Sequence, residues 1–168
     1  MNRIEEINQK HNRVKELLER LHVKGILLKT QANFCWFTAG GLNEVTIADT
    51  LGVSSILVTR DHRYIISNRI ESARMMEDEG LQDLQFTLVE YEWYKGSEYE
   101  AVKSIINPNE IVCDVSGYGY TSQPEEINVL RYQLMEPEIK RYLWLGQKAS
   151  QAVEAALYMA KPGMSECM

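Results

Sequence analysis

The sequence predicts an α/β fold in which helices flank a mixed β-sheet and a long helix follows at the C-terminal end. Short apolar runs alternate with longer stretches whose apolar residues recur at three-four spacing, the periods of buried strands and amphipathic helices. Gly, Pro, Asn and Asp separate these stretches as turn signals. Alternating helices and strands, with hairpins included, favour a mixed sheet covered by helices.

Residues 2–22 are predicted to form the first helix, because apolar side chains fall on one stripe of its surface. The stripe consists of Ile4, Ile7, His11, Val14, Leu18 and Leu21. His11 has no Cys or His four residues further on. We therefore expect it at the boundary of the stripe and not at a metal site.

The stretch 25–41 is the one around which the chain is organised. Gly25 opens a short apolar run that is typical of a buried strand, and a polar corner follows at 29–33. A second β-prone run, 34–38, leads to Gly40 and Gly41. The polar corner and the glycine pair allow the backbone to approach a ligand or a partner, although the pattern also fits a core hairpin with a glycine exit.

The middle of the chain supplies a hairpin and three further helices. The helix after the hairpin begins at Asn68, whose side chain can accept from the first turn while Glu71 reaches back to the cap. Ser97 with Glu100 indicates a second capping box, and Pro124 fits the first turn of a helix. The predicted elements are strands 53–59 and 64–67, helix 68–80, strand 84–91, a helix from 97, strand 111–115 and a helix from 122.

The last segment, 137–160, is rich in Ala and predicts a long helix, which Lys161, Pro162 and Gly163 end. Ser165 and the residue after it then look like the start of another element. We therefore expect two parts: a first domain over 1–134, and over 135–168 a linker helix with the truncated start of a second domain.

Composition narrows the classes of function. The 168 residues carry a net charge of −6, and 45% of them are hydrophobic, enough for a core. Between positions 71 and 100, nine acidic residues face two basic ones, a local charge of −7. This balance argues against nucleic acid as a partner. The acidic stretch fits a solvated face, or a surface for basic partners.

The chain contains no apolar run of the ~20 residues that span a bilayer, and its first residues are polar, unlike a signal peptide. Its cysteines, Cys35, Cys113 and Cys167, are too far apart for a zinc spacing and do not form a disulfide framework. The prediction is a cytoplasmic protein that does not bind membranes.

Motifs of catalysis are missing from the sequence. The three histidines form no metal-binding spacing, and neither phosphate-loop, dinucleotide nor nucleophile-elbow patterns occur. Gly117 and Gly119 are expected to form a turn, and Cys35 is expected to pack in a strand. The residues alone therefore predict an α/β domain without a self-contained active site.

A resemblance goes further than these patterns. Gly25-Ile-Leu-Leu, followed by Asn33-Phe-Cys-Trp-Phe-Thr38-Ala-Gly-Gly41, resembles the N-terminal domain of the creatinase/prolidase/aminopeptidase P metallopeptidases, which has a ribonuclease H-like fold. The hairpin, Asn68-Arg-Ile-Glu71, and the exit from Glu138 through Gly146 to Lys161-Pro-Gly-Met-Ser-Glu166 are similar to the family in order and spacing. The sequence departs from the family pattern at Phe37 and at Ala39.

The resemblance implies a peptidase that cleaves before proline with two divalent metal ions (Mn, Co or Zn). Two Asp, one His and two Glu would hold these ions in a catalytic domain beyond Gly163. We therefore assign no catalytic and no metal-binding residue to this chain. The family's N-terminal domain builds the dimer and closes over the active site. On that basis Asn33, Trp36, Gly40 and Gly41 are candidates for positioning or interface roles.

Arg69 is a further candidate, because a guanidinium binds a substrate carboxylate bidentately. Each assignment has a structural alternative. Trp36 also fits a buried core aromatic, and Arg69 also fits an exposed residue in the first turn of a helix.

Three functions follow from these observations. The leading hypothesis is the dimerisation and active-site-gating domain of an Xaa-Pro peptidase, whose partners would be its own catalytic domain, a second copy and short proline-containing peptides. The first alternative is a non-catalytic, peptidase-like module that binds basic partners. The second is the N-terminal domain of a creatinase-type amidinohydrolase.

Overall fold

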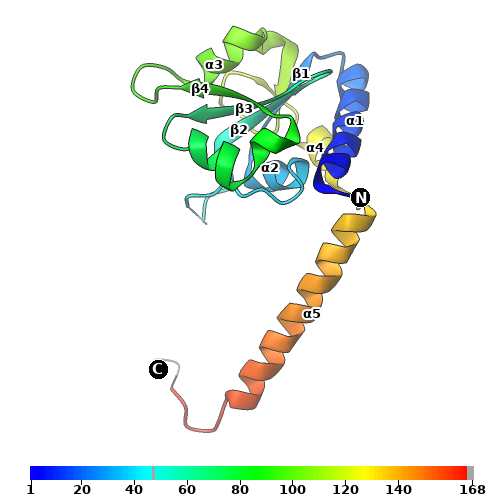
Figure 1. Ribbon diagram of the computed structural model, residues 1–168, viewed down its shortest axis with the longest axis vertical. Helices are drawn as coiled ribbons and strands as arrows, with labels where there is room; N and C mark the ends of the chain where they lie inside the picture. The colour runs from blue at the N-terminus through cyan, green and yellow to red at the C-terminus, as the bar shows by residue number, and fades with distance from the viewer. Residues whose placement is uncertain (47, 166–168) are drawn as a thin grey trace. The chain divides into compact units, whose positions relative to one another are not determined.

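The computed structural model describes residues 1–46 and 48–165, and the chain divides into two units, Met1–Gln133 and Leu134–Met168. The first unit is built on a six-stranded mixed sheet with the order β4-β3-β2-β1-β5-β6 (Figure 1). Its strands are β1 (Gly25–Thr30), β2 (Leu51–Thr59), β3 (Arg63–Asn68), β4 (Thr87–Tyr91), β5 (Ile111–Cys113) and β6 (Thr121–Ser122). The mixed sheet predicted from the alternation of elements is confirmed.

Strand direction changes across the sheet. β2 lies antiparallel to both β1 and β3, whereas β5 runs parallel to β1 and to β6, and β4 runs parallel to β3. The carboxyl ends of β1, β3, β4 and β5 therefore meet at one edge of the sheet, where β2 begins. Ligands of open α/β sheets usually bind at such an edge.

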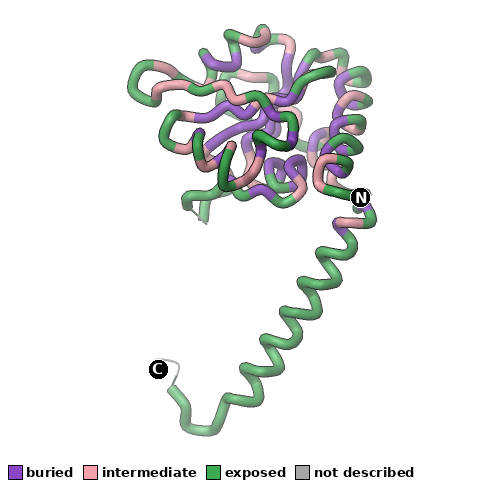
Figure 2. Tube along the Cα trace, in the orientation of Figure 1, coloured by how far each residue is buried: buried purple, intermediate pink, exposed green. Residues whose placement is uncertain are grey.

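Helices cover both faces of this sheet. The helices of the first unit are α1 (Arg3–Leu21), α2 (Gln31–Phe37), α3 (Glu98–Ile105) and α4 (Pro124–Asn128), joined by single turns η1 (Arg74–Asp78), η2 (Leu81–Leu84), η3 (Pro108–Glu110) and η4 (Val129–Arg131). Ile26 and Leu28 point to the face that carries α1 and α2, and Leu27 between them packs with Val102 of α3. Strand alternation thus sorts neighbouring residues into two cores, one on each face of the sheet. Figure 2 shows that the sheet strands are among the buried segments of the first unit.

Residues 34–37 of the run 34–38, predicted as a strand, belong to α2, and Thr38 is the C-cap residue of this helix, so that prediction is wrong. Thr30 caps the helix by accepting from the main-chain N–H of Asn33 at 3.3 Å. The buried side chains Asn33, Phe34, Trp36 and Phe37 then recur at helical spacing. Their β-propensity is overridden because one helical face buries them all.

Several other elements differ from their predicted bounds, among them the strand predicted over 111–115, which ends at Cys113. Residues 72–78, with η1 inside them, are helical instead of 68–80, and Glu71 bonds Arg74 instead of returning to the cap at Asn68. The strand predicted from 84 begins at Thr87, because η2 occupies the preceding residues. The helix predicted from 122 begins at Pro124, as β6 takes up Thr121–Ser122.

His11 is buried, not at the boundary as predicted. Its Nε2 lies 2.8 Å from the carbonyl oxygen of Thr59, and its Nδ1 accepts from Nε of Arg63 at 2.9 Å. Because Nδ1 is an acceptor, the imidazole is neutral and carries its proton on Nε2. Burial, with a smaller effect from the Arg63 charge, lowers the pKa of His11.

The cysteines also differ from expectation. Cys35 is exposed on α2 instead of packed in a strand. Cys113 is buried at the end of β5, and burial raises the pKa of its thiol to about 12. Cys167 lies outside the described residues.

The second unit contains α5 (Glu136–Met159), which confirms the long helix predicted over 137–160. Pro137 lies in its first turn, where no main-chain N–H is needed. Glu138 accepts from the main-chain N–H of Met135 at 2.8 Å and so completes the start of the helix. Large apolar side chains, Tyr142, Leu143 and Trp144 among them, are exposed along α5.

Candidate functional site

A buried polar cluster lies where β1 and β5 end side by side. The Asp114 carboxylate, 4% exposed, accepts from the main-chain N–H groups of Lys29 at 2.8 Å and Thr30 at 3.0 Å. It also accepts from the Thr30 hydroxyl at 2.8 Å and from the Asn33 amide at 2.8 Å. Four N–H and O–H donors, with the Cys113 thiol as a fifth donor at 3.8 Å, thus saturate this carboxylate, so it positions the start of α2 and is not available as a general base.

Asn33, one of the predicted site residues, is the centre of this cluster and is 1% exposed. Its Nδ2 donates to Asp114 and, at 3.2 Å, to Oδ1 of Asn128 on α4. Its Oδ1 is buried and has no hydrogen-bond partner in the part of the chain that the structure describes. Asn33 therefore ties α2 to β5 and to α4.

Trp36 is buried at 7% exposure and packs at 6.0 Å from the ring of Phe37. The ammonium of Lys10 lies 5.6 Å from the Trp36 ring centroid and donates to the Trp36 carbonyl at 2.5 Å. Glu6 accepts from the same ammonium at 2.6 Å, forming a buried ion pair. The surroundings of Trp36 are those of a buried aromatic side chain in the core, which is the alternative to a positioning or interface role.

Gly40 and Gly41 form a tight turn after α2. Gly40 has a φ of 111°, which L side chains rarely adopt, and no atom lies within 4 Å of the position a Cβ would occupy. At Gly41 a Cβ would lie 2.7 Å from the hydroxyl of Thr38, which accepts from the Gly41 N–H at 2.9 Å. The turn thus needs glycine at both positions, and at Gly40 it leaves bare backbone open to a partner.

Arg69 lies apart from the other candidates, directly after β3. Its guanidinium is exposed and pairs with Glu92 at 2.7 Å, an interaction that raises the pKa of Arg69. Within residues 1–46 and 48–165, no hydrogen bond or ion pair joins Arg69 to Asn33, Trp36 or the glycine pair. The structure therefore brings Asn33 and Asp114 together but leaves Arg69 separate.

Two charged residues of these clusters were not recognised in the sequence. Asp114 lies near the end of the strand predicted over 111–115, and a polar residue at the carboxyl end of a buried strand is a signal that could have indicated it. Lys10 gives no such signal, because a lysine next to an apolar stripe is normally exposed. Only its contacts with Glu6 and Trp36 show that it is buried.

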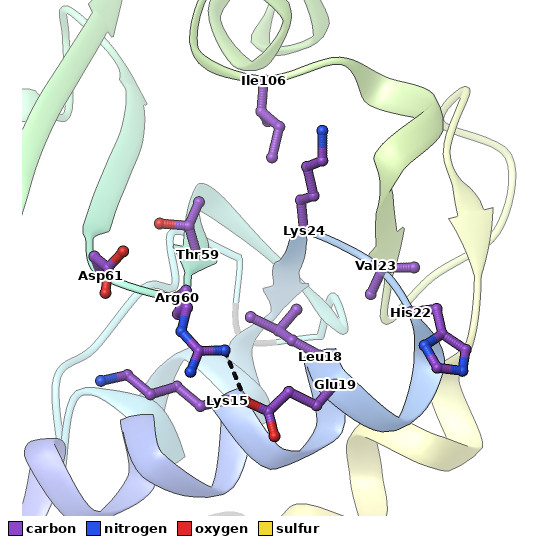
Figure 3. A pocket seen from close by; sticks show the side chains of 10 residues that line it. All are labelled: Lys15, Leu18, Glu19, His22, Val23, Lys24, Thr59, Arg60, Asp61 and Ile106. Atoms are coloured by element: carbon purple, nitrogen blue, oxygen red, sulfur yellow. Dashed lines mark hydrogen bonds and ion pairs between the residues drawn. The ribbon is translucent and has the colours of Figure 1, made fainter.

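Another hollow lies at the opposite end of the sheet, between the end of α1 and the β2–β3 turn (Figure 3). It has a volume of about 570 Å³. Its rim carries opposite charges that are already paired, Arg60 with Glu19 at 2.7 Å and Lys24 with Glu110 at 2.6 Å. None of the predicted site residues lines it, so we do not take it as the functional site.

Metal and membrane sites were also sought. Within residues 1–46 and 48–165, no group of three or more His, Cys, Asp or Glu side chains is arranged to hold a metal ion. The two divalent ions that the resemblance implies find no fitting ligand set there. Over the same residues, every helix is too short or too polar to cross a bilayer.

Comparison with known proteins rests on structure, since no protein-family profile and no curated protein matches the sequence. An Xaa-Pro dipeptidase from Bacillus anthracis aligns with a TM-score of 0.69 and 17% identity over 95% of this chain. The prolidase from Pyrococcus horikoshii OT3 aligns with a TM-score of 0.68 and 16% identity over 94%. This chain shares its fold with the Xaa-Pro peptidases.

The resemblance inferred from the sequence is thereby confirmed at the level of the fold. This chain spans 45% of the length of each of these two proteins. An Xaa-Pro aminopeptidase structure from Streptococcus thermophilus, 17% identical, aligns with a TM-score of 0.51 over 74% of this chain and 98% of its own. The described fold is thus found both within longer peptidase chains and in a chain that it covers almost completely.

Proposed function

We propose that this chain is the N-terminal domain of a metal-dependent Xaa-Pro peptidase, where it forms the dimer contact and closes over the active site. The observation that supports the proposal most is the alignment with an Xaa-Pro dipeptidase over 95% of this chain, with α5 as its final helix. The catalytic chemistry would belong to residues outside this chain. No catalytic step is therefore assigned to the residues described above.

The segment after α2 supplies the proposed gating contact. The turn at Gly40 and Gly41 is fixed from two sides: Arg3 donates to the Thr38 carbonyl at 2.9 Å, and Glu79 accepts from the Leu42 N–H at 2.8 Å. Beyond this anchored turn, Leu42 is 52% and Val45 65% exposed. A rigid base with apolar side chains beyond it suits contact with a second protomer or with a catalytic domain.

Of the other predicted residues, Asn33 and Trp36 would support the segment after α2 and would not contact a substrate. Asn33 and Trp36 anchor α2 through Asp114 and Lys10, so they hold the base from which the turn leaves. Arg69, exposed just after the end of β3, remains the candidate for binding a substrate carboxylate. On binding, its guanidinium would exchange the carboxylate of Glu92 for that of the substrate.

The test uses the protein encoded by the complete reading frame. We expect it to release proline from Xaa-Pro dipeptides, to lose this activity with a chelator and to regain it with Mn²⁺, Co²⁺ or Zn²⁺. The double variant Leu42→Ser with Val45→Ser should weaken the dimer or raise KM, whereas Tyr132→Ser, an equally exposed change outside the segment, should alter neither. Absence of peptidase activity in the metal-loaded protein would remove the proposal.

The alternative, a module for basic partners, rests on the acidic stretch 71–100. Several of those carboxylates are already engaged: Glu92 with Arg69 at 2.7 Å, and Glu71 with Arg74 at 2.7 Å. The stretch therefore offers less unpaired charge than its composition indicates. Salt-sensitive capture of the chain by basic peptides, together with a catalytically silent full-length protein, would favour this alternative.

A further inference from the structure

A second hollow, of about 400 Å³, lies at the sheet edge where β1 and β4 end and β2 begins. Its lining includes Lys29, Asp49, Val53, Tyr91, Glu98 and Tyr118. These residues come from β1, β2, β4, the start of α3 and the two loops beside them, so the fold itself assembles the hollow. We call it the tyrosine pocket. None of the predicted site residues Asn33, Trp36, Gly40, Gly41 and Arg69 lines it, although its Glu98 belongs to the acidic stretch 71–100.

We propose that the tyrosine pocket binds the guanidinium of an arginine side chain presented by a protein partner. The first argument is that the pocket already holds a cation of its own. The Lys29 ammonium lies 4.5 Å from the centroid of the Tyr118 ring and is paired with the Glu98 carboxylate. An aromatic face beside a carboxylate is the arrangement that recognises organic cations.

The second argument is the charge of the pocket. Glu98 accepts from Lys29 through one oxygen and from the Ser55 hydroxyl through the other, which holds the carboxylate in place. Asp49 adds a second negative charge, so the lining carries two carboxylates against one ammonium. An anionic ligand would face both carboxylates, whereas a cation would restore neutrality.

The third argument concerns shape and protonation. Burial, and then the Glu98 charge, raises the pKa of Tyr91, so its phenol stays neutral and serves as an uncharged wall. Tyr118 is 43% exposed and lies at the open side of the pocket. A planar guanidinium can stack on a tyrosine ring while it donates to a carboxylate, which an ammonium does less well.

The surroundings favour an arginine that belongs to a protein. The loop between β4 and α3 joins Tyr91 to Glu98 and carries Trp93, 64% exposed, and Tyr94, 58% exposed (Figure 1). Exposed aromatic side chains on a loop whose two ends, Tyr91 and Glu98, line the pocket supply the apolar contact area typical of protein interfaces. The pocket shares one lining residue, Val45, with the proposed gating contact. The argument for the site does not depend on the peptidase assignment, because Glu98, Asp49 and Tyr118, the groups that would bind the guanidinium, belong to no proposed gating or catalytic contact.

The test is an NMR titration of the 168-residue chain with N-acetyl-arginine amide, whose only charge is the guanidinium. N-acetyl-citrulline amide, which has the same shape without the charge, is the matched probe. We expect saturable shifts of the main-chain amides around Asp49, Tyr91 and Tyr118 with the arginine probe and much smaller ones with citrulline. Absence of saturable shifts, or equal shifts with both probes, would overturn the proposal.

Substitutions in the pocket sharpen the test. Tyr118→Leu should weaken binding by about two- to five-fold, the range of an exposed cation–π contact. Glu98→Gln should weaken it further, whereas Glu100→Gln, an exposed change on the same helix, should alter it by less than about two-fold. Lys29→Met should strengthen binding, because it removes the internal cation that competes for Glu98.

Lys29→Met also separates a cation site from an anion site. If the pocket used Lys29 to bind an anionic group, this variant would lose all binding, and the proposal would be wrong. Equal weakening by Glu98→Gln and Glu100→Gln would show unspecific attraction to an acidic surface and would overturn it too. Thermal unfolding of each variant checks the fold, and Tyr118, being exposed, provides a variant that should retain it.

Discussion

Asp114→Ala should be among the most damaging single changes in the first unit. It removes the acceptor of four hydrogen bonds between 2.8 and 3.0 Å, and it leaves the buried main-chain N–H of Lys29 and the partly buried N–H of Thr30 without this partner. An orphaned buried donor costs about 1–3 kcal/mol. Two such donors, with the loss of the Asn33 contact, lead us to expect a loss of about 3–5 kcal/mol in the free energy of unfolding.

Urea denaturation followed by circular dichroism measures this loss. Asp83→Ala, an exposed aspartate in η2, is the control and should change the free energy of unfolding by less than about 0.5 kcal/mol. The loss of unfolding free energy for Asp114→Asn should lie between those for Asp83→Ala and Asp114→Ala. The amide of Asn keeps one acceptor oxygen, but its NH₂ group is a donor that would face the other N–H groups. A loss below about 1 kcal/mol for Asp114→Ala would refute the reasoning that this carboxylate holds the start of α2.

Three further predictions concern buried groups. Because the pKa of His11 is lowered on folding, the unfolded chain binds the extra proton, and the free energy of unfolding should fall as pH drops below about 6.5. In urea titrations at several pH values, His11→Gln should flatten this dependence, whereas the control His62→Gln, at an exposed position, should not. Iodoacetamide at pH 8 should label the exposed Cys35 but leave the buried Cys113, whose pKa is raised to about 12, unlabelled until the chain unfolds. Mass spectrometry measures the labelling of both cysteines, and rapid labelling of Cys113 would contradict its burial. Asn43→Ala should lower the free energy of unfolding by about 1–3 kcal/mol, because the Asn43 amide forms two hydrogen bonds, at 2.6 and 3.0 Å, with the main chain of β2. An unchanged urea midpoint would show that these bonds do not contribute to stability.

Local pattern predicted those elements whose signal repeats along the chain. The stripe of α1 was recognised from its period, the hairpin of β2 and β3 from two apolar runs around a turn, and α5 from its Ala-rich composition. Residues 34–37 of α2 were assigned to a strand and residues 31–33 to a polar corner, because the aromatic composition of 34–37 outweighed a helical period too short to recognise. Packing of one helical face against the sheet decided that element.

The predicted site residues show the same limit. Asn33 could be named from its motif, but its partner Asp114 lies 81 positions away and meets it only because β5 pairs with β1 in parallel. The interface roles of Gly40 and Gly41 and the carboxylate-binding role of Arg69 stay predictions. Their tests are the dimer and the kinetics of the full-length protein.

The sequence by itself determined the α/β class, the order of most elements and the resemblance to the Xaa-Pro peptidases, since each depends on residues that are neighbours along the chain. The tertiary structure alone decided which charges are buried and with which partners they pair. Lys10 lies beneath Trp36, Lys29 lies against Tyr118, and Asp114 holds α2, although each is an ordinary charged residue in the sequence. The physical reason is that the burial of a charge depends on partners supplied by distant strands and helices, and no local period records them.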